Sequence, residues 1–187
     1  MFRIVKFLFY SLFAIFSMAF IVYLLLPAPA LPPPPPNSLT SPEPADRAFS
    51  LRPAYFNQDD RKQTMDYYKN YFVNYPHKGV ALFTYRLNYP PEDSSFLVRP
   101  HMYSSYLEEV VHPFRESLFI NGFSPKEQKD DIWIYGVHYN QKITVKYIPS
   151  SLYPRLLIGA SALVLLLMVI RELSGSTKLL LGKKRDA

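Results

Sequence analysis

The sequence predicts an α+β fold: a small antiparallel sheet with two helices, flanked by N- and C-terminal transmembrane helices. Three observations support this class. Two apolar segments lie near the ends of the 187-residue chain. Between them, one stretch repeats apolar residues at helical spacing, and others alternate apolar and polar residues as strands do. The length suggests one domain with appended segments.

The first apolar segment, residues 7–26, contains no charged side chain. At 1.5 Å per residue its 20 residues match a hydrocarbon core about 30 Å thick, which predicts a transmembrane helix. A second span is predicted over residues 152–171. There Tyr153 suits the membrane interface, Arg155 is expected to extend outward to the headgroups, and Arg171 closes the far end. A short hydrophobic helix docked on the domain is the alternative.

Short basic tails, residues 1–6 and 172–187, flank these two segments. The positive-inside rule places both tails in the cytoplasm, so the intervening domain, residues 47–151, is expected to be extracytoplasmic. The chain has no Cys and no Asn-x-Ser/Thr sequon, which favours a bacterial inner membrane over a eukaryotic secretory route. Cleavage after Ala30 is the alternative, but the apolar segment is longer than the roughly 7–15 residues of a signal peptide.

The net charge of +6 lies mainly in the two tails, and the residues between them are nearly neutral. A nucleic-acid-binding domain would carry a basic cluster on its folded part. This distribution therefore excludes a nucleic-acid partner and favours the lipid bilayer, with the tails on its cytoplasmic side.

Proline makes up nine of the twenty residues between 27 and 46. Because Pro lacks the N–H and fixes φ, this segment is predicted to be an extended polyproline II linker that holds the domain off the bilayer. Leu31 followed by five prolines also resembles the cores that EVH1 or profilin-type partners bind. Such partners are cytosolic, so that hypothesis, a cytosolic polyproline adaptor, requires the inverted topology.

Within the domain, Asn57 is predicted to cap a helix over residues 58–75 that Pro76 ends. Its apolar stripe has spacings of three and four, in Met65, Tyr68 and Phe72. A strand follows over residues 80–89, with one face made by Ala81, Phe83, Tyr85 and Leu87. A turn at 90–93 and a short edge strand at 96–99 complete this part.

A second helix is predicted over residues 101–119, kinked at Pro113 and ended by Asn121-Gly122. Its inward side chains are Met102, Tyr106, Val110 and Phe114. A capping box at 124–127 indicates a further short helical turn.

The last predicted element is a hairpin over residues 132–148. Apolar residues alternate with polar ones along its second strand, in Ile143, Val145 and Tyr147. The turn is expected near Tyr135-Gly136 or Tyr139-Asn140.

No nucleotide-binding, nucleophile-elbow or paired-Cys motif occurs. Glu109-x-x-His112, with Glu116 one turn further, has the spacing of half a carboxylate di-metal site, but the second half is missing. His101 lies eleven residues from His112, too far along a helix to share a metal with it. The sequence therefore predicts no catalytic residues, no cofactor and no metal ligands.

A polar face could nevertheless converge on an acidic ligand if the sheet and the second helix face each other. Its residues are Tyr85, Arg86, Tyr89, Arg99, His101 and Arg115. A periplasmic ligand-binding sensor or enzyme is therefore the alternative to the main prediction. The abundant Tyr and the single Trp favour a protein contact surface, and with it a protein partner.

Small residues form a strip on each apolar segment: Ser11, Ala14 and Ser17 on the first, and Gly159, Ala160, Ser161 and Ala162 on the second. Small residues let membrane helices approach closely, so the two helices are expected to pack together or against a partner's spans. The sequence thus predicts a non-catalytic accessory or scaffold subunit of an envelope membrane complex.

Overall fold

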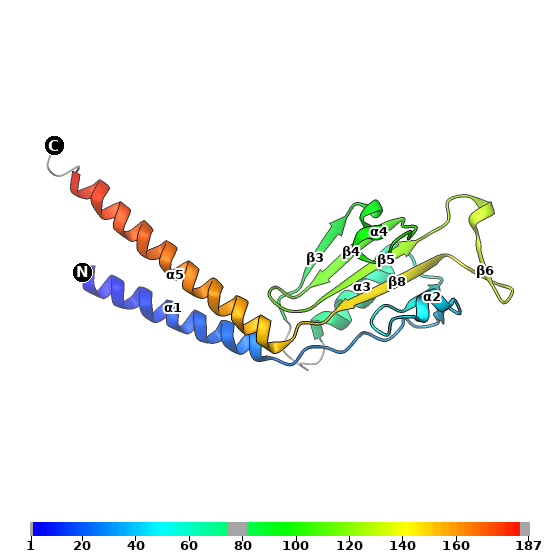
Figure 1. Cartoon of the computed structure of the whole chain (residues 1–187), viewed down its shortest axis with the longest axis horizontal. Coiled ribbons are helices and arrows are strands. Elements are labelled where there is room, and N and C mark those ends of the chain that lie inside the picture. Colours follow the sequence, from blue (N-terminus) through cyan, green and yellow to red (C-terminus); the bar gives the residue numbers. More distant parts are fainter. Residues whose placement is uncertain (1, 75–81, 184–187) are drawn as a thin grey trace. The chain divides into compact units, whose positions relative to one another are not determined.

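The computed structural model describes residues 2–74 and 82–183 (Figure 1). The chain forms two compact units, residues 1–26 with 151–187, and residues 27–150. The first contains a pair of helices, and the second is an α+β domain with a six-stranded antiparallel sheet and a small two-stranded sheet. The predicted fold class is confirmed. Residues 27–46, expected to form a linker, belong to the second unit.

The helical unit consists of α1 (Phe2–Leu25) and α5 (Leu152–Lys183). Residues Ile4–Leu25 and Leu152–Ser174 have mean hydropathies of 2.3 and 2.2, and both are long enough to cross a membrane. Both predicted apolar segments are therefore helices of suitable length and composition. The helix α5 also continues well beyond residue 171, where the predicted span ends.

Arg155 binds the end of the neighbouring helix. Its guanidinium is buried and donates hydrogen bonds to the carbonyl oxygens of Leu24, at 3.1 Å, and Leu26, at 3.0 Å. The last carbonyl oxygens of a helix lack intrahelical donors, so Arg155 supplies N–H donors to carbonyl oxygens at the end of α1 that would otherwise be unpaired. The expectation that Arg155 extends outward to the headgroups was wrong, because its guanidinium binds these carbonyl oxygens instead.

The two helices pack closely at Gly159, which is buried. A Cβ atom built there would lie 2.3 Å from Leu24 Cδ1 and 3.3 Å from Phe20 Cε1. Ala162 is half-buried, whereas Ala160 and Ser161 are exposed. Only part of the predicted small-residue strip on α5 therefore faces α1, as expected when four consecutive residues wrap around a helix.

The large sheet has the strand order β1-β2-β8-β5-β4-β3, with every neighbouring pair antiparallel. Its strands are β1 (Leu39–Thr40), β2 (Ala54–Asn57), β3 (Tyr85–Tyr89), β4 (Tyr106–Val111), β5 (Ser117–Phe123) and β8 (Gln141–Ile148). The small sheet pairs β6 (Ile132–Ile134) with β7 (Val137–Tyr139). The helical elements of the domain are α2 (Pro44–Arg47), α3 (Arg61–Asn74), α4 (Ser94–Leu97) and the 3-10 turns η1 (Pro91–Asp93) and η2 (Gln128–Asp130).

Helix α3 begins three residues later than predicted. Its cap is Asp60, not Asn57: Asp60 Oδ1 accepts a hydrogen bond from the Gln63 backbone N–H at 2.7 Å, and Gln63 Oε1 accepts one from the Asp60 N–H at 2.9 Å. This reciprocal capping box satisfies two backbone donors at the helix start. Asn57 instead ends β2. The predicted end at residues 75 and 76 lies outside the described residues.

The apolar stripe of α3 packs on one face of the sheet, as the predicted spacing requires. Met65, Tyr68 and Phe72 are fully buried. They join a single core cluster with the inward side chains of the sheet, Tyr55, Tyr106, Val110, Leu118, Ile120, Ile143, Val145 and Tyr147. The predicted alternation of Ile143, Val145 and Tyr147 is thus confirmed in β8.

The predicted helix over residues 101–119 was wrong, because this stretch forms most of the β4–β5 hairpin. The apolar residues used to predict it, from Met102 to Phe114, are spaced by four, and four is also two strand periods. Glu108 lies on the same face of β4 as Tyr106 and Val110, and it is buried because two arginines pair with it. Because Glu108 is charged, the alternation of buried and outward residues along β4 does not appear in the sequence as an alternation of apolar and polar residues.

Pro113 lies in the turn between β4 and β5, where no ladder hydrogen bond requires its missing N–H. The His112 N–H donates to the Glu116 carbonyl at 3.0 Å, the Arg115 N–H donates to the His112 carbonyl at 2.9 Å, and Phe114 has φ 61°. Asn121-Gly122, predicted to end a helix, lies within β5 instead. Gly122 is required there because a Cβ atom would lie 2.1 Å from the ring of Tyr106 on the paired strand.

Two further strand predictions and the hairpin pairing changed, and one turn prediction was confirmed. The strand predicted at 80–89 begins at Tyr85, and residues 80 and 81 lie outside the described part. In β3, Tyr85 and Leu87 are exposed. The edge strand predicted at 96–99 is wrong, because α4 ends at Leu97 and a turn follows. The hairpin predicted over 132–148 is correct in its Tyr135-Gly136 turn, one of the two predicted positions, which joins β6 to β7 with both residues at positive φ. It is wrong in its second strand, because β8 pairs with β2 and β5 instead.

We expect Gly159→Leu to separate α1 from α5, because the new side chain must displace the buried Leu24. Overpacking of this kind costs about 1–3 kcal/mol. Thermal unfolding of the purified protein in detergent should show a lower Tm, whereas Ala160→Leu, at the adjacent exposed position, should leave Tm unchanged. Equal effects of the two substitutions would contradict the close contact.

We expect Gly122→Ala to destabilise the domain by about 1–3 kcal/mol through the clash with the Tyr106 ring. In a Tyr106→Leu background the same substitution should cost much less, because the ring that it meets is gone. Chemical denaturation of the four proteins would give the coupling energy. Additive effects would show that Gly122 is needed for another reason.

Candidate functional site: a pocket on the outer face of the sheet

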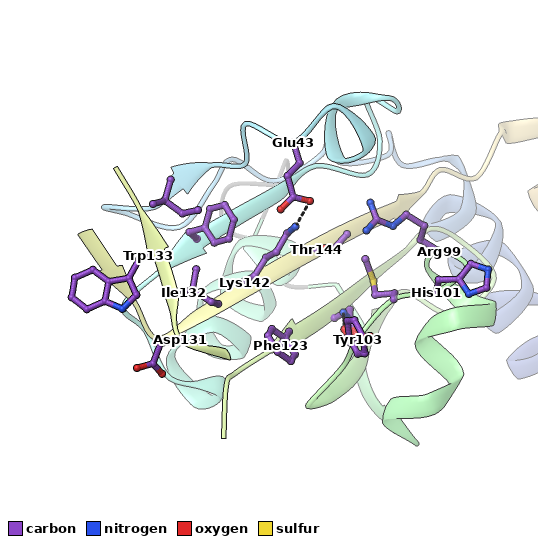
Figure 2. Close-up of a pocket in the computed structure, with 14 residues that line it drawn as sticks. Glu43, Arg99, His101, Tyr103, Phe123, Asp131, Ile132, Trp133, Lys142 and Thr144 are labelled. Carbon is purple, nitrogen blue, oxygen red and sulfur yellow. Dashed lines mark hydrogen bonds and ion pairs between the residues drawn. The ribbon is translucent and has the colours of Figure 1, made fainter. Parts of the chain in front are cut away.

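A pocket of about 490 Å³ lies on the sheet face opposite α3, here called the outer face (Figure 2). The strands β2, β5 and β8 contribute residues to it, together with the loop that follows α4, the start of the β6–β7 arm and Glu43. The lining residues are Glu43, Phe56, Arg99, His101, Met102, Tyr103, Asn121, Phe123, Asp131, Ile132, Trp133, Ile134, Lys142 and Thr144.

Strand alternation places the floor of this pocket. Successive side chains of a strand point to opposite faces of the sheet. Ile143 points into the α3 core, so Lys142 and Thr144 on either side of it point to the outer face. Asn121 lies opposite Thr144 in the β5–β8 ladder. Lys142 lies opposite Phe56 of β2, with its Nζ 5.4 Å from the centre of that ring. The floor thus combines an amide, a cation and an aromatic ring.

A buried carboxylate organises the charges beside the floor. Asp46 is 3% exposed, and its oxygens accept from Ser41 Oγ at 2.7 Å and pair with Arg99 Nη1 at 2.8 Å and Lys142 Nζ at 2.8 Å. Glu43 pairs with the same Lys142 Nζ at 2.9 Å. Two carboxylates thus lie against two cations, so this part of the pocket carries little net charge.

Burial raises the pKa of Asp46, but the hydrogen bonds from Lys142 and Ser41 and the nearby charges of Lys142 and Arg99 outweigh it. The pKa of Asp46 is therefore lower than its ordinary value of 3.8. Asp46 is ionised at neutral pH and holds both cations in place beneath the pocket.

Asn121 presents an acceptor without a partner. The residue is 2% exposed, and its Nδ2 donates to the Tyr103 carbonyl at 3.2 Å. Its Oδ1 accepts no hydrogen bond from any residue in the described part of the chain. A buried polar atom without a partner costs free energy, so Asn121 destabilises the fold slightly at this point.

Exposed aromatic side chains lie at the rim. Trp133 is 62% exposed and Tyr103 is 81% exposed. Figure 2 shows Trp133 and Asp131 at one end of the pocket, with Arg99 and His101 at the other. Large exposed aromatic groups around an amphipathic floor are typical of surfaces that bind other molecules.

The predicted polar face does not come together. Arg99 and His101 line the pocket, but Tyr85, Arg86 and Arg115 do not. Arg86 pairs with Glu108 beside Arg61. This predicted convergence was wrong because it required a helix over residues 101–119, and the chain forms most of the β4–β5 hairpin there.

Two of the remaining members of that face, Tyr89 and Arg115, are bound by carboxylates. The Tyr89 hydroxyl donates to Glu109 at 2.6 Å, and this hydrogen bond is the largest of the causes that raise the pKa of Tyr89 to about 12. Arg115 binds Glu116, with Nη2 to Oε1 at 3.0 Å. Tyr85 lies exposed on the edge strand β3.

The Glu109, His112 and Glu116 pattern does not form one cluster either. His112 Nδ1 lies 2.8 Å from Glu116 Oε1, and the imidazole stacks on Phe72 with ring centres 4.2 Å apart. Glu109 lies on the strand face opposite its neighbour Glu108, bound by Tyr89. Among the described residues, no group of three or more His, Asp or Glu side chains is arranged to hold a metal.

The sequence interpretation missed most of the pocket. Asn121, Phe123, Asp46 and Lys142 were not singled out as site residues. One signal was present: Asn121 directly follows the apolar residues 118–120, where a buried amide needs a partner. Comparisons with protein families, curated proteins and solved structures found no match to this chain.

We expect Asp46→Asn to lower the free energy of unfolding by about 1–3 kcal/mol at pH 7, because Arg99 and Lys142 lose their shared counter-charge. The folded pKa is depressed, so the stabilisation is present above the unfolded pKa and is lost as pH falls through the folded pKa. The difference between wild type and variant should therefore shrink below about pH 4. Chemical denaturation at pH 7 and at lower pH would measure it, and a constant difference would contradict the ion pairing.

Proposed function

We propose that this chain is a two-span membrane protein that presents an extracytoplasmic α+β domain for protein interaction. In this proposal it is a non-catalytic accessory or scaffold subunit of an envelope membrane complex, with both termini in the cytoplasm. The bacterial inner membrane is the location that the sequence favours. The apolar helices α1 and α5 and the short basic tails support the membrane placement.

The observation that carries the interaction role is the outer-face pocket. It joins a charge-balanced floor to exposed Trp133 and Tyr103. An extended segment of a partner protein supplies apolar side chains that pack against this aromatic rim.

A ligand-binding sensor is the second candidate, and the volume of the pocket favours it. About 490 Å³ lies within the range of roughly 300–1,000 Å³ typical of small-molecule sites. Arg99 and His101, both predicted for this role, contribute to the lining. In this case an acidic or amphipathic small molecule would occupy the pocket, and its binding would raise the Tm of the purified protein.

The cysteine-free chain allows a direct test of topology. Single substitutions Tyr135→Cys, at an exposed turn of the domain, and Ser176→Cys, in the C-terminal region, would be treated in intact cells with a membrane-impermeant maleimide. Labelling at position 135 alone, on full-length protein, is the expected result. Labelling at position 176 alone would overturn the proposed orientation and favour the cytosolic polyproline adaptor.

Photo-crosslinking would test the interaction surface. Benzoylphenylalanine placed at Trp133 should capture the same partner that co-purifies with the wild-type protein, whereas placement at Lys69, exposed on α3, should not. Trp133→Ala should weaken co-purification without lowering Tm, because most of its side chain is exposed. No change on substitution of both Trp133 and Tyr103 would reject this surface as the contact site.

A further inference from the structure

The proline segment, residues 27–36, packs on the domain with a period of three. Pro29, Pro32 and Pro35 are buried, whereas Ala30, Pro33 and Pro36 are exposed. A polyproline II helix has three residues per turn, so one edge of the segment faces the domain along its length. The expected spacer is therefore a docked strap within the compact unit of residues 27–150.

The domain binds the carbonyl groups of this segment. Polyproline II makes no internal hydrogen bonds, so every carbonyl oxygen is free to accept. The Tyr147 hydroxyl donates to the Pro29 carbonyl at 2.7 Å, and the Tyr67 hydroxyl donates to the Pro34 carbonyl at 3.0 Å. Arg115 Nη2 donates to the Pro27 carbonyl at 2.9 Å.

These three donors come from different elements and are fixed there. Tyr67 lies on α3, Tyr147 on β8 and Arg115 in the β4–β5 turn. Arg115 is held by Glu116, and the ring of Tyr67 lies 5.1 Å from that of Tyr68, which is fully buried. The groove is therefore preorganised by the core rather than shaped by the segment alone.

The hydroxyl of Tyr67 is a donor at neutral pH. Burial, and secondarily the nearby Tyr71, raise its pKa above the ordinary value of 10.0. Leu31 adds an apolar anchor, because it packs against the α3 core cluster. Tyr hydroxyls that bind carbonyls, together with aromatic and apolar contacts to proline rings, form the general chemistry by which proteins bind proline-rich segments.

We propose that the groove lined by Tyr67, Tyr147 and Arg115 is a recognition site for proline-rich segments in the polyproline II conformation, occupied in cis by residues 27–36. The ligand that it takes in trans is the same segment, residues 27–36, of a second copy of this chain. The tethered segment has a high local concentration, so it excludes a competing ligand until it is displaced.

Cysteine scanning tests the cis contact. Pro32→Cys and Pro35→Cys should react with a maleimide about tenfold or more slowly than Pro33→Cys and Pro36→Cys in the purified full-length protein. All four variants replace a proline by cysteine, so they share the loss of ring stiffness and differ in burial. Rates would be normalised to the protein unfolded in urea. Equal rates at the four positions would overturn the proposal.

A peptide of residues 27–38 tests recognition in trans. The full-length Pro29→Ser/Pro32→Ser/Pro35→Ser variant should bind the fluorescent peptide, and the wild type, with its groove occupied, should not. Ala30→Ser/Pro33→Ser/Pro36→Ser, at the exposed positions one residue further along the chain, is the control and should resemble wild type. Adding Tyr67→Phe or Tyr147→Phe to the first variant should weaken binding about two- to tenfold per hydroxyl removed.

Two results would reject recognition in trans. One is equal binding of a scrambled Gly/Ser peptide, and the other is binding that both Tyr→Phe substitutions leave unchanged. Should the triple variant lose its fold by circular dichroism, Pro32→Ser alone takes its place, with Pro33→Ser as its control.

Discussion

The packing of α3 against one face of the sheet is the contact on which the rest of the domain depends. Its three fully buried side chains, Met65, Tyr68 and Phe72, meet the inward residues of the sheet in one core cluster. A single helix of 14 residues cannot cover a face of six strands. The proline segment covers a neighbouring part of that face, where Leu31 and the Tyr147 hydroxyl meet it.

Buried carboxylates connect the elements that the core does not join. Asp46 joins α2 to Arg99 and to β8. Glu108 joins β4 to Arg61 of α3 and Arg86 of β3. Glu116 holds Arg115 beside the proline segment. In each case burial raises the pKa of the carboxylate, but side-chain hydrogen bonds and nearby positive charges outweigh it, and the pKa is lowered. In a chain without disulfides, these ion pairs specify which segments meet.

The two faces of the sheet therefore carry different surfaces. The α3 face holds a proline-rich segment of the chain itself through hydroxyl and guanidinium donors. The outer face presents the pocket with its exposed aromatic rim. The membrane-anchored interaction subunit that we propose would use the first surface to fix the segment and the second to meet a partner.

The sequence by itself determined the two apolar helices, the α3 stripe, the β8 alternation and the α+β class, because each depends on local periodicity or segment length. Only the tertiary structure decided the β4–β5 hairpin, where a spacing of four suits both a helix and a strand and where Arg61 and Arg86 make Glu108 an acceptable buried residue. It also decided the pocket and the docked proline segment. Both depend on residues such as Asp46 and Lys142, or Tyr67 and Pro34, that are far apart in the chain and have no shared local pattern.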